Sequence, residues 1–281
     1  PHSPPRDPLW SRGLGDVYKR QNNNSAATQF NWTFDSTVPT ISSVSLNAAN
    51  TELTVTFGEN VYDTTGGSGD LEAADFALSI SGGAATVAAT PASISKTSDK
   101  IWVLGLTISG TATGSETITV VPASATSIYD VAANAASTSQ SNNTATLTEK
   151  VAPTMTITAQ NPGGSTVSDG DTSKDATLAL TFTSSEATSN FAESDITLGN
   201  GTLSSFTASS STVYTATFTP SADGATTIDV AGETFTDAAS NNNTAATQFN
   251  WTFDSTVPTI SSVSLNAANT ELTVTFGENV Y

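Results

Sequence analysis

Apolar and polar side chains alternate with a period of two along most of the chain after residue 21. In the segment ELTVTF, the apolar residues Leu53, Val55 and Phe57 are separated by threonines. Successive side chains of a β-strand point to opposite faces, so this pattern predicts a strand with one face in a core and the other in water. The 3.6-residue periodicity of helices is not evident, so we expect helix only as single turns, such as one at 70–76. The strand alternation recurs at 102–108, 178–182, 214–218 and 249–253.

Turn-forming residues interrupt these strand patterns at short intervals. Glycine and asparagine, which tolerate positive φ, gather at 64–70, 81–83, 199–201 and 222–224. Many short strands separated by such turns are typical of β-sandwiches. The alternating phenylalanines and Trp32, Trp102 and Trp251 occupy apolar positions of these patterns, so we expect them in the cores. On this interpretation the chain has no exposed aromatic platform for a sugar.

A segment of 41 residues occurs twice in the chain. Residues 22–62 and 241–281 differ only at Ser25, which is Thr244 in the second copy, and the offset from 22 to 241 is 219 residues. This spacing is too long for a solenoid repeat of roughly 20–50 residues. It fits a pair of sandwich domains of about 100 residues each. We interpret the duplication as the reiteration of a two-domain unit, and misassembly of near-identical sequencing reads is the alternative.

Weaker echoes divide this unit into two halves near Lys150. The segment VPTISSV, which begins at Val38, has a counterpart in APTMTIT, which begins at Ala152. Further along each half, DVAAN begins at Asp130 and DAASN begins at Asp237. The predicted organisation is therefore a foreign segment (1–21), the C-terminal strand of a truncated domain (22–37), a first-type domain (38–150), a second-type domain (151–256) and the truncated start of another first-type domain (257–281).

The first 21 residues differ in composition from the rest. They contain Arg6, Arg12, Lys19 and Arg20, which are half of the 8 basic residues, and the single histidine, His2. The end of the segment, DVYKRQ, resembles the translation of a transposon-end adapter used in sequencing libraries. We interpret residues 1–21 as a cloning or sequencing artefact, with a disordered linker as the alternative, and the fold prediction begins after them.

The composition argues against several classes of function. Cysteine is absent and the one histidine lies in the segment 1–21, so cysteine or histidine zinc sites and Ser–His or Cys–His nucleophiles have no components. The 8 basic and 26 acidic residues give a net charge of −18, which disfavours nucleic acid and anionic lipid as partners. Apolar runs stay below the roughly 18 residues of a membrane span. The N-terminus lacks a signal-peptide pattern, so we expect any export signal or anchor outside this sequence.

Two carboxylates suffice for a glycosidase, and pairs could be drawn from Glu59, Asp75, Glu186 and Asp195. These residues recur at matching places in both halves, as scaffold features do and as a single active site usually does not. We therefore do not expect an enzyme.

Calcium is the cofactor that the acidic residues favour. Asp35, Glu149 and Asp254 each precede a domain-opening proline by four residues. Calcium takes about six to eight oxygen ligands, so loops that bring Glu186 and Asp237 toward Asp254 would form a site that stiffens the linker between domains. The alternative is that these acids are solvated turn residues and caps. The candidate metal ligands are Asp35, Glu59, Asp75, Asp130, Glu149, Glu186, Asp195, Asp237, Asn241 and Asp254.

The loop SDGDTSKD at 168–175 is also acidic, with Asp169, Asp171 and Asp175. It lacks the glycine and the terminal glutamate of an EF-hand calcium loop. We therefore interpret it as a polar hairpin loop.

Several segments resemble the bacterial Ig-like repeats of very large secreted adhesins and biofilm proteins. They are PTISSVSLN, LTVTFGENVY, SEATSNFAESDITLGNGTLSSF, YTATFTPSADG and FTDAASNNNTAATQFNWTFDSTVPT. The resemblance covers residues 22–281. It implies an all-β fold of tandem immunoglobulin-like β-sandwich domains, and it is more specific for fold than for function.

The resemblance implies a structural role outside the cell. We expect a non-catalytic stalk or spacer of a bacterial surface or secreted adhesin, whose partners are the neighbouring Ig-like domains of the same chain. Its excess negative charge would keep such chains soluble and mutually repulsive. The alternatives are a glycan- or protein-binding Ig-like module and an accessory region of a large secreted hydrolase.

Overall fold

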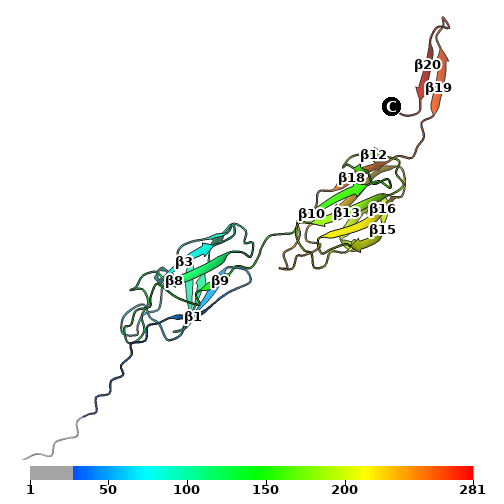
Figure 1. Ribbon diagram of the computed structural model, residues 1–281. Helices are drawn as coiled ribbons and strands as arrows, with labels where there is room; N and C mark the ends of the chain where they lie inside the picture. Colours follow the sequence, from blue (N-terminus) through cyan, green and yellow to red (C-terminus); the bar gives the residue numbers. More distant parts are fainter. Residues whose placement is uncertain (1–27, 281) are drawn as a thin grey trace, which may run out of the picture. The chain divides into compact units, whose positions relative to one another are not determined.

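The computed structural model of the protein describes residues 28–280 (Figure 1). The segment 1–21, interpreted above as an artefact, lies outside the described residues, as do residues 22–27 and Tyr281. Nearly every regular element in the described part is a β-strand, and its helical elements are single 3-10 turns. The all-β sandwich fold predicted from the alternation is confirmed. Within residues 28–280, no helix has the length and apolar character needed to cross a membrane.

The first sandwich contains two main sheets and a short strand pair. One sheet has the order β1–β2–β6–β5, the second has the order β3–β8–β9, and β4 pairs with β7. All of these neighbours are antiparallel. The strands are β1 (Ile41–Leu46), β2 (Glu52–Phe57), β3 (Phe76–Ser81), β4 (Thr86–Val87), β5 (Ser93–Ser98), β6 (Ile101–Gly105), β7 (Ile108–Ser109), β8 (Thr117–Pro122) and β9 (Thr144–Thr146).

The apolar face of β2 builds the centre of the first core, as the alternation predicts. Leu53 lies opposite Leu104 of β6, and Val55 lies opposite Trp102. All four side chains are buried, and Phe57 packs beside Phe76 with ring centroids 6.4 Å apart. Residues from both sheets form one continuous cluster that extends from Ile41 to Leu147.

The run at 102–108 forms two strands, and its prediction as one strand is wrong. β6 ends at Gly105, and the backbone N–H of Leu106 donates to the carbonyl of Thr51 (2.8 Å) before β7 begins at Ile108. A Cβ atom on Gly105 would lie 2.2 Å from Ser93 Oγ of β5, so a side chain here would require the Ser93 hydroxyl to move. The chain leaves the sheet of β6 at Gly105, although the alternation of apolar residues continues through Leu106 and Ile108.

The second sandwich has a five-stranded sheet, β11–β10–β13–β16–β15, and a four-stranded sheet, β12–β18–β17–β14. The pair β12–β18 is parallel, and the other neighbours are antiparallel. The strands are β10 (Met155–Gln160), β11 (Thr166–Val167), β12 (Thr172–Ser173), β13 (Leu178–Ser184), β14 (Ile196–Gly199), β15 (Gly201–Ala208), β16 (Val213–Pro220), β17 (Gly224–Val230) and β18 (Phe249–Phe253).

Aromatic rings fill the second core. The Phe191 ring lies 5.0 Å from Tyr214 and 5.1 Å from Phe235, both in edge arrangements, and Trp251 meets Phe218 edge-on at 6.2 Å. Edge contacts of this kind add to the stabilisation that burial of the rings provides. This core extends from Met155 to Trp251 and is a separate cluster from the first.

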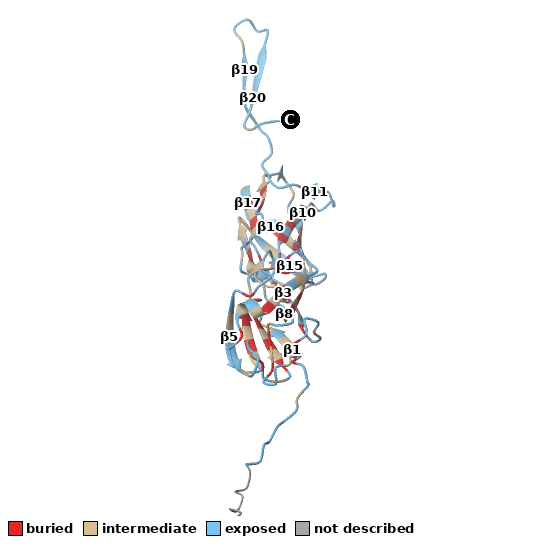
Figure 2. Ribbon diagram, turned by 90° about the vertical axis from the view of Figure 1, so that its left-hand side faces the viewer, coloured by how far each residue is buried: buried red, intermediate tan, exposed pale blue. Residues whose placement is uncertain are grey.

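The second repeat copy ends in a hairpin formed by β19 (Ile260–Leu265) and β20 (Leu272–Phe276). Its sequence is that of β1–β2, yet its apolar residues are exposed (Figure 2). The difference arises because β2 is paired with β6, whereas β20 pairs only with β19 among the described residues. The same sequence is thus buried in one place and exposed in another.

Residues 28–37 show the converse. They copy residues 247–256, which include β18, but they form no strand, and Phe30, Trp32 and Phe34 are exposed. The predictions that Trp32 is a core residue and that the chain exposes no aromatic cluster are therefore wrong. In the second sandwich this sequence forms β18, which pairs with β17 and β12, and its Trp251 is buried and packs against Phe218 of the other sheet. Burial of these rings depends on the sheet that the strand joins.

Candidate metal centre

Each sandwich contains a tight Asp–Asn turn, formed by the recurring segments DVAAN and DAASN. In the first, Asn134 donates its backbone N–H and its side-chain amide to the two carboxylate oxygens of Asp130 (2.7 and 2.8 Å). In the second, Asn241 donates in the same way to Asp237 (2.8 Å for both bonds). Both aspartates are buried. The turns close the same loop in both sandwiches, so the sequence echo reflects a shared structure.

Three carboxylates meet at the second of these turns. Single carboxylate oxygens of Glu149, Glu186 and Asp237 lie within 4.8 Å of one another, and we call this group the acidic cluster. Glu186 stands just after β13, and the loop that follows it is tied to the turn by a bridge between Thr188 and Asp237. The Asn241 side-chain amide also donates to Glu149 Oε2. Segments far apart in the sequence therefore converge at one point.

Glu149 lies on the connection between the two sandwiches. The preceding residue, Thr148, exchanges hydrogen bonds with the side chain of Asn50 (2.7 and 2.9 Å) in the first sandwich. Four residues after Glu149, the carbonyl of Pro153 accepts the N–H of Thr244 (3.0 Å) in the second sandwich. Glu149 itself accepts the backbone N–H of Val151. The acidic cluster therefore involves the connecting segment as well as the body of the second sandwich.

The pKa values of Glu186 and Asp237 move in opposite directions. Burial raises the pKa of Glu186, and the negative charges of Glu149 and Asp237 raise it further. Burial also acts to raise the pKa of Asp237, but hydrogen bonds from the side chain and backbone of Asn241 outweigh it and lower the pKa. The ionised form of Asp237 is therefore favoured, whereas burial and the neighbouring negative charges disfavour the ionised form of Glu186.

The donor set suits a hard cation. Three carboxylate oxygens form the cluster, and calcium prefers oxygen ligands from Asp, Glu and backbone carbonyls. A divalent ion would remove the repulsion that raises the pKa of Glu186. The chemistry of the residues therefore fits calcium better than zinc, which favours nitrogen and sulfur ligands.

Other candidate ligands occupy structural positions. Asp75 accepts the backbone N–H of Glu72 (2.7 Å) at the turn η1 (Ala73–Asp75), where the sequence predicts a single helical turn. Asp195 accepts the N–H of Ala192 (2.9 Å) at the matching turn η2 (Glu193–Asp195). These two carboxylates are caps of 3-10 turns, which is the alternative that the sequence left open.

The remaining candidates are not members of the acidic cluster. Glu59 and Asp130 have carboxylate oxygens within 4.8 Å of each other in the first sandwich. Asp35 accepts the N–H of Thr37 (2.9 Å) in the segment 28–37. Asp254 accepts the N–H of Thr256 (3.0 Å) and donates its own N–H to Ser173, so the loops of Glu186 and Asp237 meet Glu149 and not Asp254. The expected approach to the Asp254 junction is therefore corrected.

The acidic loop at 168–175 passes from β11 in one sheet to β12 in the other, so its interpretation as a hairpin loop is wrong. Asp169 Oδ1 accepts the N–H of Asn250 (2.6 Å), and Asp171 Oδ2 accepts the N–H of Ser168 (2.6 Å). The third acid, Asp175, accepts the hydroxyl of Ser173 (2.7 Å).

Sequence reasoning missed a buried carboxylate in the first sandwich. Glu116 is fully buried, and its carboxylate accepts the N–H groups of Ala84 (2.9 Å), Ala85 (3.1 Å) and Thr113 (2.9 Å). Burial alone would raise the pKa of Glu116, but these backbone hydrogen bonds outweigh it and lower the pKa to about 2. Its signal in the sequence is its phase, because Glu116 shares the inward register of Ile118 and Val120.

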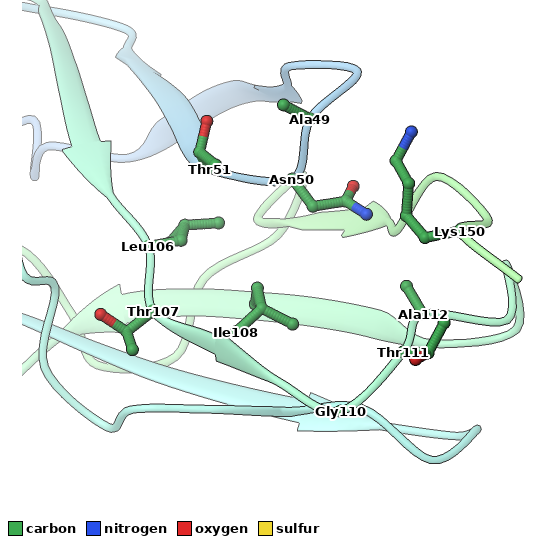
Figure 3. A pocket seen from close by; sticks show the side chains of 10 residues that line it. All are labelled: Ala49, Asn50, Thr51, Leu106, Thr107, Ile108, Gly110, Thr111, Ala112 and Lys150. Carbon is green, nitrogen blue, oxygen red and sulfur yellow. The ribbon is translucent and has the colours of Figure 1, made fainter. Parts of the chain in front are cut away.

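A shallow cleft of about 490 Å³ opens on the first sandwich, and Asn50 and Lys150 contribute polar atoms to its wall (Figure 3). The Asn50 amide is already engaged with the backbone of Thr148, and the backbone N–H of Lys150 donates to the carbonyl of Ala112 (2.8 Å). These hydrogen bonds hold the loops around the cleft together. The cleft is lined by Ala49, Asn50, Thr51, Leu106, Thr107, Ile108, Gly110, Thr111, Ala112 and Lys150.

The sequence of the second sandwich matches a known protein family. Residues 149–253 match the family model of the bacterial Ig-like domain. The second sandwich is a bacterial Ig-like domain. The resemblance seen in the sequence is confirmed for this segment, and the immunoglobulin-like sandwich fold with it. The matched segment of the Ig-like domain begins at Glu149, so all three residues of the acidic cluster lie inside it.

Two solved structures of bacterial proteins are similar to the chain, with low sequence identity and low TM-scores. Invasin, a bacterial integrin-binding protein, has 17% identity and a TM-score of 0.31, with 86% of this chain and 47% of the invasin chain covered. InvD of Yersinia pseudotuberculosis has 14% identity and a TM-score of 0.28, with 81% of this chain and 62% of the InvD chain covered. The chain thus spans less than two thirds of either structure. No curated protein matches the sequence.

Proposed function

We propose that the chain is part of a non-catalytic stalk of a bacterial surface or secreted adhesin or biofilm protein, in which Ig-like sandwiches act as spacers. One observation carries the proposal. Polar groups that could serve chemistry recur at matching places in both sandwiches and fasten turns there: Asp130 and Asp237 in the Asp–Asn turns, and Asp75 and Asp195 at the 3-10 turns. A repeated scaffold uses polar groups in this way, whereas an active site is usually single.

Charge and packing support a spacer outside the cell. Each sandwich has its own core of large side chains, so each can resist opening independently. The net charge of −18 makes neighbouring chains repel each other, which keeps a crowded array of stalks apart.

The spacer role predicts a mechanical signature. When the full chain is stretched in a single-molecule force experiment, the two sandwiches should open in two separate events. Each event should release about 350 Å of chain, because each core holds roughly 100 residues at about 3.3–3.6 Å per residue. Opening without a measurable force peak would contradict a load-bearing spacer.

We further propose that calcium binds the acidic cluster and stiffens the connection between the sandwiches. The supporting observations are the three oxygen ligands, the raised pKa of Glu186, and the position of Glu149 between segments anchored in each sandwich. A bound ion would hold Glu149 to Glu186 and Asp237, and so would fix the connecting segment to the second sandwich.

Calcium should therefore stabilise the second sandwich. Extracellular modules bind calcium with dissociation constants of roughly 0.1–1 mM, so 10 mM calcium should raise the melting temperature by roughly 5–15 °C. The Glu186→Gln variant should lose this response. Glu193→Gln, which changes an exposed acid on η2, is the matched control and should keep it. Calorimetry of the full chain with calcium and with a chelator makes the measurement.

The two parts of the proposal fail separately. An unchanged melting temperature in calcium, or an equal response in Glu186→Gln and the parent chain, would refute the calcium site. Neither result would affect the spacer, which the force experiment tests.

A further inference from the structure

We propose that Asn200 loses its side-chain amide spontaneously in the folded protein, and that this reaction loosens the second sandwich. The modification converts asparagine to aspartate and isoaspartate, with water as the co-reactant. Asn200 and Gly201 lie where β14 ends and β15 begins, and they are the single Asn–Gly pair in the sequence. The inference is independent of the proposed function, because it rests on one connection inside the second sandwich.

The reaction needs a backbone nitrogen beside the asparagine side chain. The Gly201 nitrogen attacks Asn200 Cγ and forms a five-membered imide, and the side-chain nitrogen leaves as ammonia with the proton that Gly201 gives up. Water then opens the imide. Cleavage at Cγ gives aspartate, and cleavage at the backbone carbonyl carbon gives isoaspartate, in which the main chain runs through the side chain. Glycine at the second position favours the attack, because it has no side chain to obstruct it.

The Gly201 N–H lies at the edge of a sheet. β15 is the last strand of the five-stranded sheet, with β16 as its neighbour. The Ser221 N–H donates to the Asn200 carbonyl (3.1 Å), and the next opposite pair is Gly201 with Pro220. Opposite pairs of antiparallel strands alternate between hydrogen-bonded and non-hydrogen-bonded, so the Gly201 N–H is directed away from β16. The attacking nitrogen therefore lies outside the β15–β16 hydrogen bonds.

The fold constrains both residues of this pair. Asn200 has a φ of 53°, a left-handed conformation that asparagine and glycine adopt more readily than other residues. A Cβ atom on Gly201 would lie 2.2 Å from the fully buried ring of Phe218 and 2.9 Å from the backbone oxygen of Thr219. A larger residue would have to displace both. The connection therefore requires the dipeptide that is most prone to amide loss.

The Asn200 side chain joins two passages between the sheets. Its amide nitrogen donates to the carbonyls of Ala222 (2.9 Å) and Ala225 (3.3 Å), where the chain passes from β16 to β17. The passages from β14 to β15 and from β16 to β17 both lead from one sheet to the other. A carboxylate has no N–H to donate and would turn an oxygen toward both carbonyls. Amide loss therefore replaces two hydrogen bonds by repulsion.

Mass mapping of the aged chain tests the site. The full parent chain is kept folded in mildly alkaline buffer, well below its melting temperature, and a second sample is kept in urea. Asn200 should convert in the folded sample before any other asparagine of residues 28–280. Asn161 is the internal control, because Pro162 follows it and has no N–H for the attack. Conversion of Asn200 only in urea, or conversion of another asparagine first, would overturn the proposal.

Two matched variants of the full chain test the consequence by calorimetry. Asn200→Asp copies one product and should lower the melting temperature of the second sandwich by roughly 4–8 °C, because two hydrogen bonds are lost. Asn161 Oδ1 accepts the N–H groups of Gly163 (3.0 Å) and Ser165 (2.9 Å), and a carboxylate can accept them equally. Asn161→Asp should therefore melt like the parent chain. Equal melting temperatures of the two variants would contradict the loosening.

Discussion

Trp251→Ala should lower the free energy of unfolding of the second sandwich by about 3–5 kcal/mol, the usual cost of truncating a buried large aromatic residue. Trp251 is 1% exposed, and its ring packs against Phe218 and Phe253. Its indole N–H also donates to Ser173 Oγ (3.2 Å), which ties β18 to β12. The substitution would leave a cavity between the two sheets and remove this hydrogen bond.

The repeat provides an internal control for this prediction. Trp32 has the same sequence neighbours but is 74% exposed, so Trp32→Ala should change the free energy of unfolding by less than about 0.5 kcal/mol. Urea unfolding of both variants, followed by far-UV circular dichroism, makes the comparison. Equal effects of the two substitutions would contradict the burial difference between the copies.

Glu116→Gln should destabilise the first sandwich at neutral pH and much less in acid. The ionised carboxylate of the buried Glu116 accepts three backbone N–H groups, and an amide would turn an N–H donor toward some of them. The pKa of Glu116 is lowered from an ordinary value of 4.5 to about 2 in the folded state. A lowered folded-state pKa adds stability above the ordinary pKa, and this stability is lost as the pH falls from 4.5 toward 2.

The measurement is a pair of denaturation series from pH 7 to pH 2.5. The parent chain should exceed Glu116→Gln in stability by a constant margin above about pH 5, and this margin should shrink steadily below it. Glu52→Gln, at an exposed position of β2, is the control that should follow the parent chain. A margin that does not change with pH would show that the charge of Glu116 contributes nothing.

The fold was predictable because its main signal is local. Alternation at Leu53, Val55 and Phe57 requires only that one face of the strand is buried, and the structure buries that face. The break at Gly105 was not predictable, because the apolar alternation continues through it and the close contact of Gly105 with Ser93 comes from a neighbouring strand. The exposure of Trp32 was missed for a related reason, since burial is a property of the whole sheet.

The acidic cluster was predictable in part. The recurrence of Asp237 and Asn241 identified a shared turn, and Glu186 belonged to the expected set. Glu149 and Asp254 both stand four residues before a proline, so the spacing could not show which of the two lies near the Asp–Asn turn of Asp237 and Asn241. Glu116 gave only the weak signal of a charged residue in an inward phase, which fits an irregular strand start equally well.

The order of strands has a consequence for a molecule under tension. In the second sandwich the chain enters through β10 of one sheet and leaves through β18 of the other, and in the first it enters through β1 and leaves through β9, again in opposite sheets. A pull applied to the ends of either sandwich is therefore transmitted across the hydrophobic core, so we expect its packing to contribute to the force at which the sandwich opens.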